Sequence, residues 1–120
     1  MTLRRFWLAA GCAILAAIVW LSVMPSPPEI EVTQGDKIGH VLAYALLMFW
    51  FCQLDTAPAR RLAYALAFAA LGIGLEFVQG ALGYRSFEAW DMVADAAGVG
   101  AGWLTATLVK PAILERFPRR

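Results

Sequence analysis

The chain has 120 residues, about the size of one ordinary domain, and 61% of its residues are hydrophobic, well above the roughly 45 to 50% of soluble globular domains. Charged residues make up 16% and the formal net charge is +1, which excludes a basic surface for DNA or RNA and an acidic tail. The mean hydropathy of +0.64 predicts one small integral membrane domain over residues 1–120. The cysteines, Cys12 and Cys52, lie in apolar runs outside any zinc or redox motif, and we expect both to be buried hydrophobes.

The first apolar segment is long enough to span a membrane. No charge occurs between Phe6 and Pro28, and about 20 apolar residues at 1.5 Å each cross a hydrocarbon core of roughly 30 Å. This run predicts a membrane helix over 6–24. A cleaved signal peptide is the alternative, because Arg4 and Arg5 resemble its basic start. The apolar run is longer than that of a signal peptide and no A-x-A-like site follows, so we expect it to be retained.

Three further apolar segments follow, at 37–54, 62–84 and 92–109. The second is just long enough if Asp36 and Lys37 remain at the interface. The third contains one charged residue, Glu76, and the fourth also contains one, Asp95. Pro111 ends the last segment because proline cannot continue helical hydrogen bonding. The sequence therefore predicts an all-α membrane four-helix bundle.

Lysine and arginine predict the orientation of this bundle, because they concentrate in short cytoplasmic segments. Eight of them would lie on one side: Arg4, Arg5, Arg60, Arg61, Lys110, Arg116, Arg119 and Arg120. Only Lys37 and Arg85 would lie on the other, beside Glu29, Glu31, Asp36, Glu88 and Asp91. Both termini are therefore predicted to be cytoplasmic, and the proline-rich connector Pro25–Gly35 extracytoplasmic.

Polar residues within the segments follow single helical faces. An ionisable group at membrane depth costs about 2.5 to 3.5 kcal/mol or more, so it is expected to face the protein interior or a wet cavity. The second segment carries Asp36, His40 and Tyr44 at i, i+4 spacing. The third carries a stripe of Ala65, Ala69, Gly72, Glu76, Gln79 and Gly83, and the fourth one of Asp91, Asp95, Gly98, Gly102 and Thr105. The small residues in these stripes predict close helix packing.

Counting inward at 1.5 Å per residue brings the three polar stripes to similar depths in the outer leaflet, which predicts a candidate site there. The predicted binding residues are Asp36, Lys37, Tyr44, Gln79, Arg85 and Asp91. If the site performs chemistry, the acid and base candidates are Glu76, Asp95 and His40. The spacing of these residues matches no metal motif, and we predict neither a metal nor a cofactor. The alternative is a structural polar network in which Glu76 bonds to Tyr44 or Gln79, and Asp95 caps a helix or pairs with Arg85.

The ordered set of these residues resembles the VanZ-like family. The resemblance is carried by Leu21-Ser22 and Pro25, Asp36-Lys37-x-x-His40-x-x-x-Tyr44-x-x-Leu47, Glu76-x-x-Gln79, Arg85, Asp91, Gly98 and Gly102. The resemblance covers nearly the whole chain. This chain departs from the family pattern at one position, where it has Asp95 and the family usually has Asn. The resemblance implies a small multi-pass protein of the bacterial inner (cytoplasmic) membrane, in a family associated with resistance to teicoplanin-type glycopeptide antibiotics.

Three classes of function follow from this sequence. In the first, the outer pocket binds a membrane lipid or a lipid-bearing envelope molecule, with Lys37 and Arg85 meeting an anionic head group. The second is a proton- or ion-coupled transport element, which would need protonatable groups across the whole membrane. The third is a structural, partner-binding membrane module. Whether the protein is an enzyme is left open, and four short helices that enclose several acids make a homo-oligomer plausible.

Overall fold

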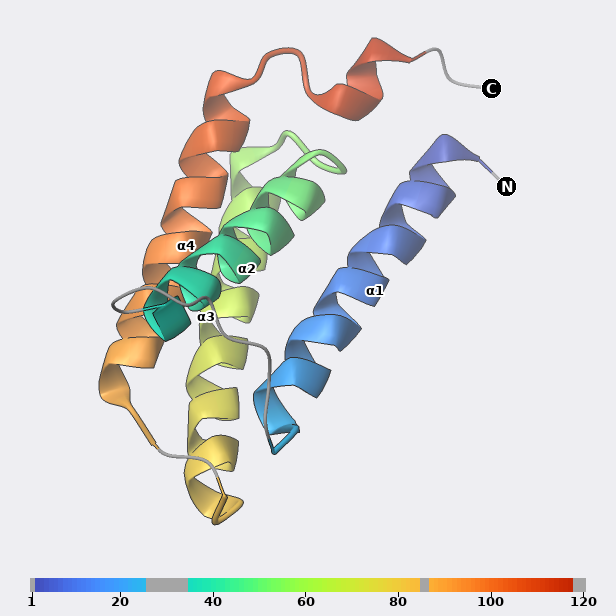
Figure 1. The fold of residues 1–120 in the computed structure, drawn as a ribbon. Helices are drawn as coiled ribbons and strands as arrows, with labels where there is room; N and C mark the ends of the chain where they lie inside the picture. The colour runs from blue at the N-terminus through green and yellow to red at the C-terminus, as the bar shows by residue number, and fades with distance from the viewer. Residues whose placement is uncertain (1, 26–34, 85–86, 118–120) are drawn as a thin grey trace.

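The computed structural model describes residues 2–25, 35–84 and 87–117, and these residues form helices and no β-strand. The α-helices are α1 (Leu3–Val23), α2 (Gly35–Cys52), α3 (Pro58–Ala81) and α4 (Ala89–Leu108), and a short 3-10 helix, η1 (Ile113–Arg116), follows. Figure 1 shows the start of α1, the turn between α2 and α3, and η1 at one end of the molecule. The all-α prediction is confirmed for the described residues.

Each helix begins before its predicted start, because its first turns contain charged residues that the apolar runs did not include. Thr2 caps α1, and its Oγ1 accepts a hydrogen bond of 3.2 Å from the amide of Arg5. Pro58 begins α3, a position at which its missing N–H leaves no bond unmade. At the other end, Gly83 has φ +83° and follows the end of α3, so the third segment stops before residue 84.

The glycines of α4 let it approach α2 very closely. A Cβ atom at Gly98 would lie 2.5 Å from the carbonyl oxygen of Val41, and one at Gly102 would lie 2.3 Å from that of Ala45. Only glycine fits at such a distance, because real Cβ atoms do not approach backbone oxygens so closely. The predicted small-residue contact is confirmed for these two glycines. Thr105 was wrongly included in the stripe, since it is exposed and Ala106 is buried instead.

The packed face of α3 follows most of its predicted stripe. Ala65, Gly72, Glu76 and Gln79 are buried, as predicted. Ala69 is only partly buried, because Phe68 fills the neighbouring position in the core. Gly83 is exposed and lies beyond the helix, so its predicted place on the packed face is wrong.

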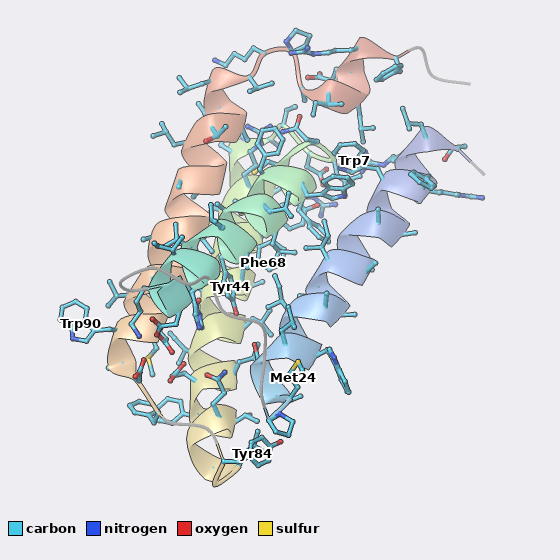
Figure 2. The ribbon with its side chains drawn as sticks, in the orientation of Figure 1. Trp7, Met24, Tyr44, Phe68, Tyr84 and Trp90 are labelled. Atoms are coloured by element: carbon cyan, nitrogen blue, oxygen red, sulfur yellow. The ribbon has the colours of Figure 1, made fainter. Side chains whose placement is uncertain are left out.

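A pair of tryptophans joins α1 to α2. The rings of Trp7 and Trp50 stack with centroids 3.9 Å apart, and each indole N–H donates a 2.8 Å hydrogen bond to the backbone carbonyl of the other residue. Figure 2 labels Trp7 in this contact. Cys12 lies on the exposed side of α1, so its predicted burial is wrong, whereas Cys52 is buried as expected. An apolar run in a membrane-type helix does not tell which of its faces packs.

Three of the described helical segments are long and apolar enough to cross a membrane. They are Leu3–Val23, Pro58–Ala81 and Ala89–Arg116, the last of which includes η1. The helix α2 does not belong to this group, because its first two turns contain Asp36, Lys37 and His40. The predicted four spanning helices are thus supported for three.

The close contact between α2 and α4 predicts opposite effects for two neighbouring glycines. Gly98→Ala places a methyl group against the backbone of α2, and we expect a loss of about 1 to 3 kcal/mol of stability. Gly100 faces open space, so Gly100→Ala should be neutral or stabilising by up to about 1 kcal/mol. Melting temperatures of the two variants in the same detergent provide the test. Equal melting temperatures would contradict the packing described here.

Candidate functional site

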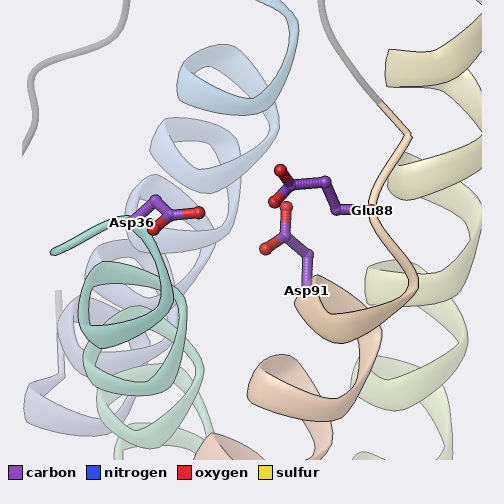
Figure 3. A group of neighbouring side chains, drawn as sticks. All are labelled: Asp36, Glu88 and Asp91. Atoms are coloured by element: carbon purple, nitrogen blue, oxygen red, sulfur yellow. The ribbon is translucent and has the colours of Figure 1, made fainter. Parts of the chain in front are cut away.

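A cluster of charged side chains lies where the first turn of α2 meets the start of α4. The ammonium nitrogen of Lys37 is 2.7 Å from Oδ2 of Asp36 and 2.5 Å from Oδ1 of Asp91, and it also contacts the carboxylate of Glu88. Figure 3 shows Asp36 on α2 facing Glu88 and Asp91. One cation therefore sits among three acids.

The next turn of α2 adds a histidine to this cluster. Nδ1 of His40 lies 2.6 Å from Oδ1 of Asp95, and its Nε2 lies 3.6 Å from Oδ2 of Asp91. The shorter contact requires a proton between the two atoms. Asp95 fits here because α3 has a glycine opposite, and a Cβ atom at Gly72 would lie 2.7 Å from its Oδ2. The stripe of α3 therefore makes room for the carboxylate.

Glu76 caps the start of α4 from the neighbouring helix. Its side chain is almost fully buried, with 1% of the residue exposed, and its Oε1 accepts a hydrogen bond from the backbone N–H of Glu88. Amide groups at a helix start lack partners within the helix, and the positive end of the helix dipole favours a carboxylate there. Glu76 is therefore bound to the same segment that supplies Glu88 and Asp91, and this partner differs from the Tyr44 or Gln79 of the alternative structural network.

Two predicted site residues, Tyr44 and Gln79, take part in contacts between helices. Tyr44 is buried, with 3% exposed, and a Cβ atom at Gly98 would lie 3.0 Å from its Cβ. Gln79 donates a hydrogen bond of 2.8 Å to the carbonyl of Ser22 and holds the end of α1. Tyr84 donates a similar bond of 2.6 Å to the carbonyl of Val23. Gln79 thus has a structural partner outside the cluster.

The structure brings together Asp36, Lys37, His40, Asp91 and Asp95. Glu76 is joined to this group through its hydrogen bond with the backbone of Glu88. Arg85 lies outside the described residues, as do residues 26–34 of the predicted connector and Arg119 and Arg120. Glu88 was not among the predicted site residues. Its signal in the sequence is its place three residues before Asp91, where a helix brings both carboxylates to one side of its first turn.

Among the described residues, the charge of this cluster is predominantly negative. Lys37 is already surrounded by Asp36, Glu88 and Asp91, so it does not offer a free positive charge. An anionic group approaching Lys37 would also approach these carboxylates. The cluster therefore favours a ligand group that donates hydrogen bonds or carries an ammonium, rather than the anionic head group that Lys37 was expected to meet.

The three carboxylates also form the arrangement of a possible cation site. One ligand oxygen from each of Asp36, Glu88 and Asp91 lies within 4.8 Å of the other two, and hard divalent cations prefer such oxygen ligands. The ammonium of Lys37 contacts all three side chains. The ammonium group of Lys37 therefore occupies the place of a metal ion and supplies its positive charge.

A groove runs from this cluster along α4. It has a volume of about 370 Å³ and is lined by Lys37, Trp90, Val93, Ala94 and Ala97. The α4 residues recur at three- and four-residue spacing, so they form one face of the helix. Trp90 is 73% exposed, and Figure 2 shows it pointing away from the bundle near the start of α4. The groove joins an apolar wall to a charged end.

The position of Lys37 predicts that its removal creates a cation site. In Lys37→Ala, the three carboxylates lose their shared cation, so we expect a lower melting temperature in calcium-free buffer and recovery by several degrees in millimolar calcium. The wild-type protein should respond no more to calcium than to sodium chloride of equal ionic strength. Adding Glu88→Gln to Lys37→Ala should weaken the recovery. Equal calcium stabilisation of the wild type would contradict the role given to Lys37.

Comparison with known proteins places the chain beside a eukaryotic relative. No family model matches it, and no solved structure matches it. The chain is 30% identical over 118 residues to Uncharacterized protein C11E3.10 of the fission yeast Schizosaccharomyces pombe, an alignment that covers 96% of this chain and 71% of the yeast protein. At this identity and coverage, the chain belongs to the same family as the yeast protein C11E3.10.

Proposed function

We propose that this chain is a multi-pass membrane protein with both termini in the cytoplasm. Three helices are long and apolar enough to cross a membrane, and large apolar side chains point outward, among them Trp20 at 65% exposed and Leu108 at 75%. Such a surface suits lipid contact. In this arrangement α2 is the fourth spanning element, and its charged first turn faces the other helices. The bacterial cytoplasmic membrane and a link to glycopeptide resistance are proposed on the VanZ-like resemblance alone.

The distribution of charge supports this orientation. The end of the bundle that contains the start of α1, the turn between α2 and α3, and η1 carries Arg4, Arg5, Arg60, Arg61, Lys110 and Arg116. The positive-inside rule assigns such an end to the cytoplasm. The cluster around Lys37 then faces the outer side of the membrane.

Cysteine labelling tests the orientation at two matched alanines. Ala57 precedes α3 and Ala89 begins α4, and both are exposed. In a background without Cys12 and Cys52, we expect Ala89→Cys to react with an impermeant maleimide in cells with a permeabilised outer membrane, and Ala57→Cys to react only after lysis. The reverse pattern would show an inverted protein, and labelling of both in intact cells would exclude membrane insertion.

We propose that the groove along α4 binds an amphiphile, a membrane lipid or a lipid-bearing envelope molecule. The observation that carries this proposal is the groove itself, whose apolar wall of Trp90, Val93, Ala94 and Ala97 leads to the charged cluster at Lys37. An acyl chain suits the wall, and the polar head would lie against Asp36, Glu88 and Asp91. Given the excess of carboxylates, a head that contains an amine or hydroxyl groups suits the site best.

A proton-transfer step at this head group is a second candidate. The pair of His40 and Asp95 has the geometry of a base oriented by a carboxylate, because Nδ1 lies 2.6 Å from Oδ1 while Nε2 faces Asp91 at 3.6 Å. Such a base can accept a proton through Nε2. Transmembrane ion coupling is less favoured, because the core beyond the cluster contains apolar side chains of α2 and α4 such as Met48, Val99 and Ala106.

Native mass spectrometry of the gently purified protein tests the groove. We expect a co-purifying lipid or envelope lipid in the wild type, and a large loss of it in Ala97→Phe, since the ring would fill the groove. Ala96→Phe is the matched control, because Ala96 is an exposed neighbour on α4 that does not line the groove. Equal retention by both variants would reject the amphiphile proposal and leave a structural or partner-binding role.

A further inference from the structure

A second cavity lies at the opposite end of the bundle, away from the cluster around Lys37. It has a volume of about 410 Å³ and lies between the turn that precedes α3, the last turns of α4 and the segment before η1. Arg61 and Lys110 contribute its basic groups, while Trp103, Ala106 and Pro111 contribute apolar wall. None of these residues takes part in the site described above.

Arg61 is a buried cation at this cavity. Only 7% of the residue is exposed. Its Nε donates a hydrogen bond of 2.8 Å to the carbonyl of Asp55, and its Nη2 donates one of 2.8 Å to the carbonyl of Cys52. These bonds and the negative end of the α2 dipole supply partial charges that offset part of the guanidinium charge. They account for the position of Arg61 at the end of α2.

No carboxylate neutralises Arg61 in the part of the chain that the structure describes. The carboxylate of Asp55, whose backbone carbonyl accepts from Arg61, pairs instead with Arg4 at 4.0 Å and Arg60 at 3.7 Å and accepts a hydrogen bond from Tyr64. A buried charge without a counter-charge is strongly destabilising in a protein interior. Because this cation lines a cavity, an anion in the cavity would remove that penalty.

The remaining polar groups of the cavity also favour an anion. Lys110 is exposed and lines the cavity, while Glu115, the acid on this wall, accepts a hydrogen bond of 3.0 Å from the amide of Ala112 through its Oε1. Two basic groups against one acid leave a formal charge of +1 on the lining. The acid is oriented toward its own backbone and leaves Arg61 without a carboxylate.

We infer that this cavity binds the phosphate head group of an anionic phospholipid. Arg61 and Lys110 would contact the phosphate, and Trp103, Ala106 and Pro111 would contact the glycerol and the first carbons of the chains. Basic pockets at the cytoplasmic side of membrane helices suit anionic lipid heads, and arginine suits phosphate through its planar fork of donors. The apolar wall favours a lipid over free phosphate.

The inference is tested by adding defined lipids to the delipidated protein and following bound lipid by native mass spectrometry, together with the melting temperature. We expect phosphatidylglycerol to bind and to raise the melting temperature more than phosphatidylcholine does. Lys110→Gln should weaken phosphatidylglycerol binding roughly fivefold, the equivalent of about 1 kcal/mol per basic residue near an anionic head. Arg5→Gln removes the same charge at the same end, outside the cavity, and should have a much smaller effect. Equal weakening by both would mean that the surface charge alone attracts the lipid.

Two threonines on α4 give a second test that is independent of charge. Each donates its hydroxyl to a carbonyl four residues earlier, Thr107 to Trp103 at 2.9 Å and Thr105 to Ala101 at 2.8 Å, but only Thr107 lines the cavity. Thr107→Phe should abolish the preference for phosphatidylglycerol, and Thr105→Phe should preserve it. Loss in both or in neither would overturn the inference.

Two further measurements distinguish a lipid phosphate from free phosphate, and binding in the cavity from binding in the groove along α4. Stabilisation by inorganic phosphate equal to that by phosphatidylglycerol would reject the lipid and assign the cavity to a soluble anion. Ala97→Phe, which fills the groove at the other end, should leave phosphatidylglycerol binding unchanged. If that variant removed the binding, the lipid would belong to the groove and the inference would fail, whatever the fate of the proposed function.

Discussion

The contact between α2 and α4 is the constraint on which the rest of the molecule depends. Two backbones meet where Gly98 and Gly102 leave no room for a Cβ atom, and this approach aligns the polar first turns of both helices. His40 then reaches Asp95, and Lys37 reaches Asp91 and Glu88. A wider spacing would separate these pairs and leave ionisable groups without partners. Packing and electrostatics are therefore set by the same glycines.

The other helices support this pair in different ways. The third helix supplies a glycine beside Asp95 and a carboxylate that caps α4. The first helix is held near its start by the paired indoles of Trp7 and Trp50 and near its end by Gln79 and Tyr84. In the described part of the chain, one end of the bundle is rich in carboxylates around Lys37, and the other is rich in arginine. The two cavities differ in charge accordingly.

The helical periodicity of the sequence predicted much of this arrangement. Small and polar residues at steps of three and four revealed much of the packed faces of α3 and α4, because small residues let helices approach closely and polar side chains gain partners there. Periodicity alone did not reveal the direction in which a polar side chain bonds. Gln79 donates a hydrogen bond to a backbone carbonyl of α1, and Glu76 accepts one from the backbone at the start of α4. Helical periodicity predicts neither of these partners. Lys37 was expected to meet a ligand, but it contacts three acids, and two of them, Glu88 and Asp91, come from a segment more than 50 residues downstream. Arg61 counted in the sequence as one charge of the positive side, and only the structure shows its burial beside a cavity.

The pairing of α2 with α4 also bears on the order in which the chain can be inserted during its synthesis. The partners of the α2 charges lie far downstream, since Glu88 follows Lys37 by 51 residues and Asp95 follows His40 by 55. At roughly 5 to 20 residues per second, a ribosome needs on the order of several seconds to cover that distance. During this interval the charged turn of α2 has Asp36 but none of the acids of α4, and placing that turn in lipid would be unfavourable. In the proposed membrane arrangement, we therefore expect α2 to remain at the membrane surface or beside the insertion machinery until α4 arrives.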